Sequence, residues 1–108
     1  MFKIKVKDME WSIKLLTDVD YVKQLEDDSL GMTDRDELTV YFRESALSQR
    51  IIIHELMHVY VASCCIHSVP ELTHEQMEEL CAEIIEYHIH DILRKSSQIL
   101  KKLKKIKA

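Results

Sequence analysis

The sequence predicts an α+β domain in which a small sheet of three or four strands packs on two long helices. Apolar residues alternate with polar ones over residues 2–15, as expected for strands with one solvent-facing side, and β-branched and aromatic residues flank a turn of aspartates over residues 30–42. After Phe42 the apolar spacing becomes helical. One glycine and one proline in 108 residues argue against a many-turned β-sandwich and against a flexible low-complexity chain.

The strands are expected in the N-terminal half. Residues 2–15 predict a β-hairpin, because two alternating runs flank the polar segment 7–10. The spacing of Val19, Val22 and Leu25 then predicts a brief helix over residues 18–28. Residues 30–42 predict a second strand pair, since β-branched and aromatic residues lie on both sides of a turn rich in aspartate.

Two long helices are expected in the C-terminal half. Ser45 or Ser48 can accept the first free backbone amide protons of a helix that runs to about Ser68, where Val69-Pro70 stops it. The second helix begins at Thr73, which has the capping-box spacing to Gln76. This helix can run past residue 93.

The chain is expected to form one domain over residues 1–95, followed by a basic amphipathic tail over residues 96–108. The tail carries apolar residues at helical spacing among lysines, so it is either a continuation of the second long helix or a separate helix. Both alternatives remain open at this point.

Charge is divided unevenly along the chain. Residues 94–108 carry seven lysines and arginines and no acid, whereas the rest carries eight bases against nineteen acids. An acidic body is a poor general surface for nucleic acid, so such binding is expected only through the tail. The tail is otherwise explained as a solvated helix end, or as a contact for an acidic partner or a membrane surface.

The sequence favours a cytoplasmic protein. Its three cysteines lack the spacing of a disulfide framework, which indicates a reducing compartment. The N-terminus has the pattern of neither a secretory signal nor a membrane anchor, and no apolar run is long enough to span a bilayer. The oligomeric state is left open.

The strongest chemical signal is the His-Glu-x-x-His pattern formed by His54, Glu55 and His58 in an otherwise uncharged segment. Residues four apart lie about 40° apart around a helix, so both imidazoles can reach one metal ion. Glu55 is offset by about 100°, which lets it stand beside the ion. Zn²⁺ bound in this way activates a water, whose proton Glu55 would accept during peptide hydrolysis.

A third zinc ligand is expected from the second long helix. Helical phase places Glu78 on the same apolar arc as Cys81, Ile85 and Ile89, whereas the other glutamates nearby gather on the polar side. A carboxylate on a core-facing arc is costly unless a metal or another group compensates it. The predicted ligands are therefore His54, His58 and Glu78, with Glu79 as the alternative if the helical phase slips by one residue.

The pattern HELMH, followed after nineteen residues by the Glu78 of MEELCAEII, resembles the gluzincin arrangement of zinc metallopeptidases. The order of the hairpin, the GMTDRDELTVYF strand pair and the two helices is similar to that of very short zincin-like proteins of phages and prophages, loosely related to the ImmA/IrrE metallopeptidases. The resemblance covers residues 28–90 and implies a minimal zincin-like fold. It also implies a zinc peptidase acting on protein, as relatives that cleave DNA-binding repressors do.

Several alternatives stay open from the sequence. The residues 37–42 could take substrate in extended form by edge pairing. Either Tyr87 or His88 could assist the site as a hydrogen-bond donor. In a different reading, the protein is a non-catalytic module in which zinc fastens two helices and the tail or sheet binds a protein or nucleic acid.

Overall fold

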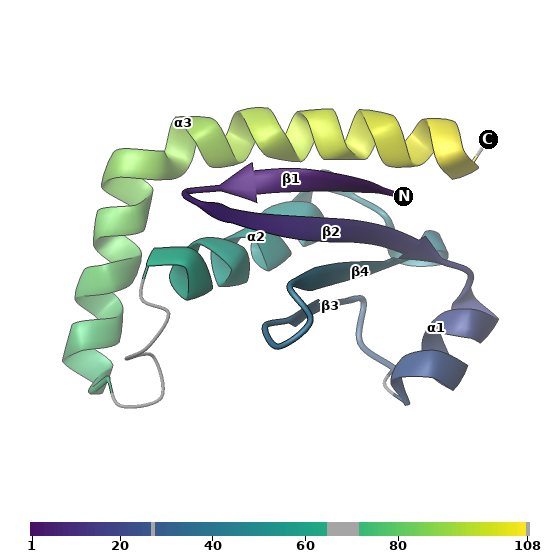
Figure 1. Cartoon of the computed structure of the whole chain (residues 1–108), viewed down its shortest axis with the longest axis horizontal. Coiled ribbons are helices and arrows are strands. Elements are labelled where there is room, and N and C mark those ends of the chain that lie inside the picture. Colours follow the sequence, from purple (N-terminus) through teal and green to yellow (C-terminus); the bar gives the residue numbers. More distant parts are fainter. Residues whose placement is uncertain (27, 65–71, 108) are drawn as a thin grey trace.

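The computed structural model describes residues 1–26, 28–64 and 72–107. It confirms the predicted α+β class, with a four-stranded mixed sheet and three α-helices (Figure 1). A short 3₁₀ turn at Glu44–Ala46 precedes the second helix. The elements follow the order β1 (Phe2–Val6), β2 (Met9–Leu16), α1 (Asp18–Leu25), β3 (Gly31–Asp34), β4 (Thr39–Arg43), α2 (Gln49–Cys64) and α3 (His74–Lys107).

The sheet has the strand order β1-β2-β4-β3. β1 and β2 form the predicted antiparallel hairpin, and β3 and β4 form the predicted second pair. The two pairs join through β2 and β4, which run parallel. β1 and β3 are therefore the two edge strands, and β4 lies inside the sheet.

One face of the sheet packs on α2 and α3. Ile13 is opposite Val40 in the register of β2 and β4, so these buried side chains project on the same side. They belong to one apolar cluster that also includes residues from both long helices. The buried members from the helices are Ile52, Leu56, Val59, Tyr60, Ala62, Ile84, Ile92, Ile99 and Leu103.

The start of α2 is capped by Ser48. Its hydroxyl accepts the backbone N–H of Ile51 at 3.3 Å, which settles the choice between Ser45 and Ser48. The structure follows α2 as far as Cys64. The predicted helix stop at Val69-Pro70 lies outside the described residues.

The helix α3 begins with the predicted capping box. The backbone N–H of Thr73 donates to the side-chain oxygen of Gln76 at 2.9 Å, and the backbone N–H of Gln76 donates to the Thr73 hydroxyl at 3.1 Å. The helix then runs without interruption to Lys107. Figure 1 shows that it bends, so that its second half turns to run along β1.

The basic tail is a continuation of α3. Ser96, Ile99 and Leu103 are buried in this segment, so its apolar side forms part of the core. Gln49 at the start of α2 also donates hydrogen bonds of 3.0 Å to the hydroxyls of Ser96 and Ser97. In the described parts of the chain, no helix has the length and apolar character needed to cross a membrane.

Candidate metal centre and active site

The helix α2 brings His54, Glu55 and His58 together, as the spacing predicts. His54 and His58 are exposed on the same side of the helix, while Glu55 is only 5% exposed. The three side chains thus divide into an accessible pair of imidazoles and a buried carboxylate beside them. A solvent-facing pair is open to a ligand, and a buried charged group requires specific partners.

The spacing of the two histidines suits a shared metal ion. Their ring centres are 5.1 Å apart and their planes meet at 73°. With Zn–N bonds of about 2.0–2.1 Å and tetrahedral angles, two imidazole rings on one zinc ion have centres about 5 Å apart. The separation of the two rings is therefore compatible with one shared ion, and the zinc site itself stays a prediction.

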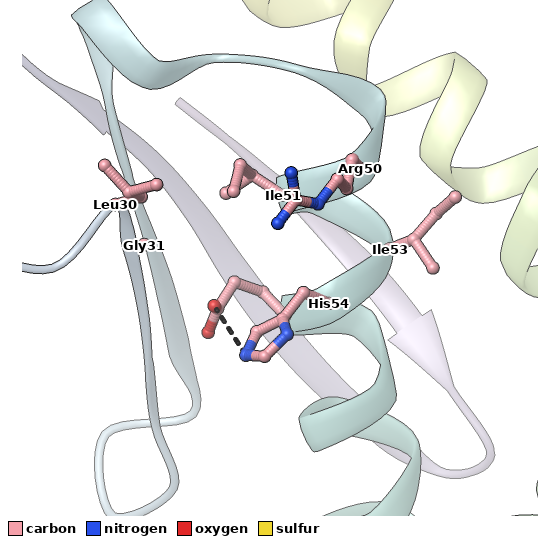
Figure 2. Close-up of a pocket in the computed structure, with 7 residues that line it drawn as sticks. Leu30, Gly31, Arg50, Ile51, Ile53 and His54 are labelled. Atoms are coloured by element: carbon pink, nitrogen blue, oxygen red, sulfur yellow. Dashed lines mark ion pairs between the residues drawn. The ribbon is translucent and has the colours of Figure 1, made fainter.

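Glu55 is held by the edge strand β3. The hydroxyl of Thr33 donates to Glu55 Oε1 at 2.8 Å and approaches the backbone carbonyl of Glu55 at 3.3 Å. The other carboxylate oxygen, Oε2, lies 3.9 Å from Nε2 of His54 (Figure 2). One oxygen is thus fixed by a neutral donor, and the other faces the accessible histidine.

The missing side chain at Gly31 provides space for the side chain of Glu55. A Cβ atom at this position would lie 3.1 Å from Glu55 Cγ and 3.3 Å from Oε2. It would also lie 3.3 Å from Cγ2 of Ile51. Gly31 and Thr33 are two residues apart on β3, so the Cα–H face of Gly31 and the side chain of Thr33 are both directed toward α2. The backbone of the edge strand can therefore approach the buried carboxylate closely.

An open pocket of about 450 Å³ lies between β3 and α2 beside this carboxylate. Leu30 and Gly31 line it on one side, and Arg50, Ile51, Ile53, His54 and Glu55 line it on the helix side (Figure 2). The walls of the pocket combine apolar side chains with a carboxylate, an imidazole and an exposed guanidinium group. This combination is typical of a site that binds a polar ligand in a fixed orientation.

Glu78 faces solvent, so the prediction that it lies on a core-facing arc is wrong. Glu78 and Glu79 are both exposed, whereas helical phase predicted Glu78 on a core-facing arc. Helical phase shows which residues share a face, but a face is buried only where another element covers it. Ile84 is the first fully buried residue of α3, because its first turns extend away from the sheet (Figure 1).

The third ligand stays a prediction. Within residues 1–26, 28–64 and 72–107, no three histidine, cysteine, aspartate or glutamate side chains lie close enough together to hold a metal ion. Glu78 is thus not drawn to His54 and His58 in this arrangement. Both candidate glutamates lie on the solvent-facing part of α3, where neither is fixed by a buried contact.

The strand that borders the site is β3 and not the segment 37–42. The expectation that residues 37–42 could pair with a substrate is wrong, because β4 lies inside the sheet between β2 and β3. Its backbone groups already pair on both sides. The sequence pattern identified both strands of the pair but held no information on which of them forms the edge.

A partly buried polar cluster joins α2 to α3 away from the histidine pair. The hydroxyl of Tyr60 donates to Asp91, and Lys95 Nζ lies 2.5 Å from Asp91 and 3.2 Å from the Tyr60 hydroxyl. The ring of His88 packs on the Tyr60 ring, with centres 5.3 Å apart. His88 thus lies beside this cluster, and Tyr87 is exposed.

Two opposing effects set the pKa of Asp91. Burial, the largest of them, raises it, but hydrogen bonds from Lys95, Tyr60 and Arg94 together hold the pKa of this carboxyl well below its usual value. Burial and the hydrogen bond to Asp91 raise the pKa of Tyr60. The cluster is therefore an ionic contact in which Asp91 is charged and Tyr60 is neutral.

Sequence reasoning did not find Thr33, Gly31 or Arg50 as site residues. Thr33 and Gly31 are two apart on a predicted strand, which indicated a shared face. That face could be assigned to Glu55 only once β3 was known to lie against α2. Arg50 is one helical turn before His54, and this spacing was the available signal for it.

No protein-family profile matches the chain, and neither a curated protein nor a solved structure matches it.

Proposed function

We propose that this protein is a zinc-dependent peptidase that hydrolyses peptide bonds in a protein or peptide substrate. The single observation that carries the proposal is the placement of Glu55. A buried carboxylate stands beside two exposed histidines whose rings are 5.1 Å apart, at the wall of an open pocket. Such a carboxylate is costly to bury and is explained by a chemical role.

His54 and His58 are the proposed metal-holding residues, with Glu78 or Glu79 as the third ligand. Zinc bound there would act as a Lewis acid that polarises a carbonyl group and lowers the pKa of a water to about 7. Neutral imidazoles and a carboxylate are donors that zinc accepts in catalytic sites. The chain itself must supply the proton transfers.

Glu55 is the proposed general base. Thr33 occupies its Oε1, so Oε2 is the oxygen available to accept the proton of the attacking water. The same carboxyl group would then give that proton to the nitrogen of the departing amine. The first transfer would protonate Glu55 and the second would restore its carboxylate, so one carboxylate serves both steps.

The edge strand β3 is the proposed guide for the substrate. It pairs with β4 on one side, and its other edge faces the pocket that Gly31 and Glu55 line. An extended peptide can add to such an edge through main-chain hydrogen bonds, which recognise a backbone without demanding one sequence. A peptide bound in this way would have a carbonyl group near Glu55.

Replacing Glu55 with glutamine tests the proposal. Turnover should fall by roughly 10²- to 10⁴-fold, because general base catalysis contributes about that much, while zinc content and fold remain. Cleavage of a diverse peptide mixture by the zinc-loaded protein, followed by mass spectrometry, provides the measurement. Glu86→Gln is the matched control, since Glu86 is exposed on α3.

Two results would contradict the peptidase. One is the absence of cleavage by the zinc-loaded wild-type protein, and the other is unchanged cleavage by Glu55→Gln. Either result with zinc still bound would favour the non-catalytic module, in which zinc only fastens the helices.

A further inference from the structure

The fold brings the two most basic segments of the chain side by side. β1 carries Lys3 and Lys5, Lys7 directly follows this strand, and the second half of α3 carries the basic tail. Figure 1 shows the last turns of α3, coloured yellow-green to yellow, running along β1. The positive charge of both chain ends thus collects on one side of an otherwise acidic molecule.

A groove of about 200 Å³ lies between these two elements. Lys3 and Lys5 line it from β1, and Lys95 and Lys102 line it from α3. Phe2 and Ile99 form apolar parts of its wall. Four lysines and no carboxylate line this groove, so it attracts anions.

Two of the four lysines are already neutralised. Lys3 pairs with Glu10 at 3.3 Å, and Lys95 pairs with Asp91 at 2.5 Å. Lys5 and Lys102 are exposed, and no carboxylate of the described residues pairs with either. Lys102 Nζ lies 4.9 Å from the centre of the Phe2 ring. This cation–π contact keeps the ammonium group of Lys102 beside the groove. The ammonium groups of Lys5 and Lys102 are therefore available to bind an anionic ligand.

A membrane surface does not suit this side of the molecule. A helix that lies on a bilayer needs a wide apolar face directed outward. In the second half of α3, Ile99 and Leu103 are turned into the core, and its large exposed aliphatic residues are Leu93 and Ile106, which lie far apart along the helix. The polar, concave surface instead fits a chain of phosphates.

We infer that the groove between β1 and α3 binds the phosphate backbone of single-stranded nucleic acid. A positively charged groove that follows one backbone is the usual device for such binding. The acidic remainder of the chain repels the second strand of a duplex, which favours a single strand. This inference does not rest on the proposed metal site, which lies on the opposite edge strand of the sheet.

Replacing the two free cations tests the inference. A fluorescein-labelled oligodeoxynucleotide of mixed sequence, about 20 nucleotides long, should bind the full chain in 0.1 M salt with micromolar affinity, measured by fluorescence anisotropy. Lys5→Gln/Lys102→Gln should weaken binding by roughly tenfold or more and reduce the salt dependence of the affinity, since two phosphate contacts are lost. Glutamine keeps a polar side chain and removes only the charge and one methylene of length, and circular dichroism verifies the fold.

Lys23→Gln/Arg35→Gln is the matched control. It removes the same charge from exposed positions on α1 and in the turn between β3 and β4. The inference is overturned if the oligonucleotide does not bind, or if both double variants weaken binding equally. It is also overturned if phosphatidylserine-containing vesicles bind and the oligonucleotide fails to compete, which would indicate a membrane ligand.

Discussion

Among single residues, Glu55 combines a charged side chain with nearly complete burial. A glutamate in an apolar helix would normally face water, yet Glu55 is buried and receives a hydrogen bond from Thr33 on a neighbouring strand. The hydroxyl compensates part of the cost of burying the carboxylate. The same contact fixes the direction of Oε2, which is what a general base requires.

Thr33→Val should therefore impair catalysis more than folding. The change keeps the shape of the side chain and removes its hydroxyl, so Glu55 loses the donor that orients it. We expect kcat to fall by roughly 10- to 100-fold, as is usual for partners that orient a catalytic group. Zinc content should remain unchanged in elemental analysis.

Thr39→Val provides the comparison for this prediction. Thr39 is buried in β4, where its hydroxyl donates to the carbonyl of Glu37 at 3.0 Å, and it has no contact with Glu55. Both variants should lose about 1 kcal/mol of unfolding free energy, measured by urea denaturation. Equal kcat values for the two variants would contradict a positioning role for Thr33.

At the scale of elements, α3 combines two environments in one helix. Its first half is mostly exposed and carries the candidate glutamates, while its second half is buried along one side against the sheet. The cluster of Tyr60, Asp91 and Lys95 fixes α3 to α2 between these parts. Because this contact joins the two helices, it helps to set the position of the first half of α3, and thus of Glu78 and Glu79, relative to His54 and His58.

The pH dependence of stability should reveal this contact. Because the pKa of Asp91 is lower in the folded state, its stabilising effect is present above its unfolded value of about 3.9 and is lost as pH falls through its folded value. At pH 7, Asp91→Asn should reduce the unfolding free energy by about 1 kcal/mol, a figure that allows for partial solvent screening.

Urea denaturation between pH 2 and pH 7 measures this effect. The difference between the wild-type protein and Asp91→Asn should shrink steadily below about pH 4. Asp36→Asn is a suitable control, because Asp36 is exposed in the turn between β3 and β4. A difference that stays constant with pH would show that the charge of Asp91 does not stabilise the contact.

Local patterns predicted the elements well, and contacts between elements decided the rest. Thr73 and Gln76 carry their capping information within four residues, so the start of α3 could be read directly. The same holds for His54 and His58 on one helical face. The orientation of Glu78 and the edge position of β3 could not be read, because both depend on which distant element covers a face.

At the scale of the whole molecule, the two ends of the chain complete one core. β1 and the second half of α3 are distant in sequence but adjacent in space (Figure 1). The basic tail therefore has two sides, one that carries buried Ile99 and Leu103 and one that carries lysines. Sequence periodicity recognised this amphipathic pattern but left open whether the helix continued.

Truncating a buried residue of the tail should destabilise the whole domain. Leu103→Ala should reduce the unfolding free energy by roughly 2–5 kcal/mol, because Leu103 is fully buried and its removal leaves a cavity. Ile106→Ala should cost much less, since Ile106 is 50% exposed. Similar urea midpoints for the two variants would indicate that the tail does not belong to the core.

Zinc content per chain tests whether His54 and His58 on α2 hold a metal ion. Elemental analysis would compare wild type with His54→Ala, Glu78→Ala, Glu79→Ala and the exposed control His90→Ala. We expect about one zinc ion per chain in wild type and His90→Ala, and loss in His54→Ala and in one of the two glutamate variants. A wild-type protein that contains no zinc and binds none on titration would contradict a zinc site on α2.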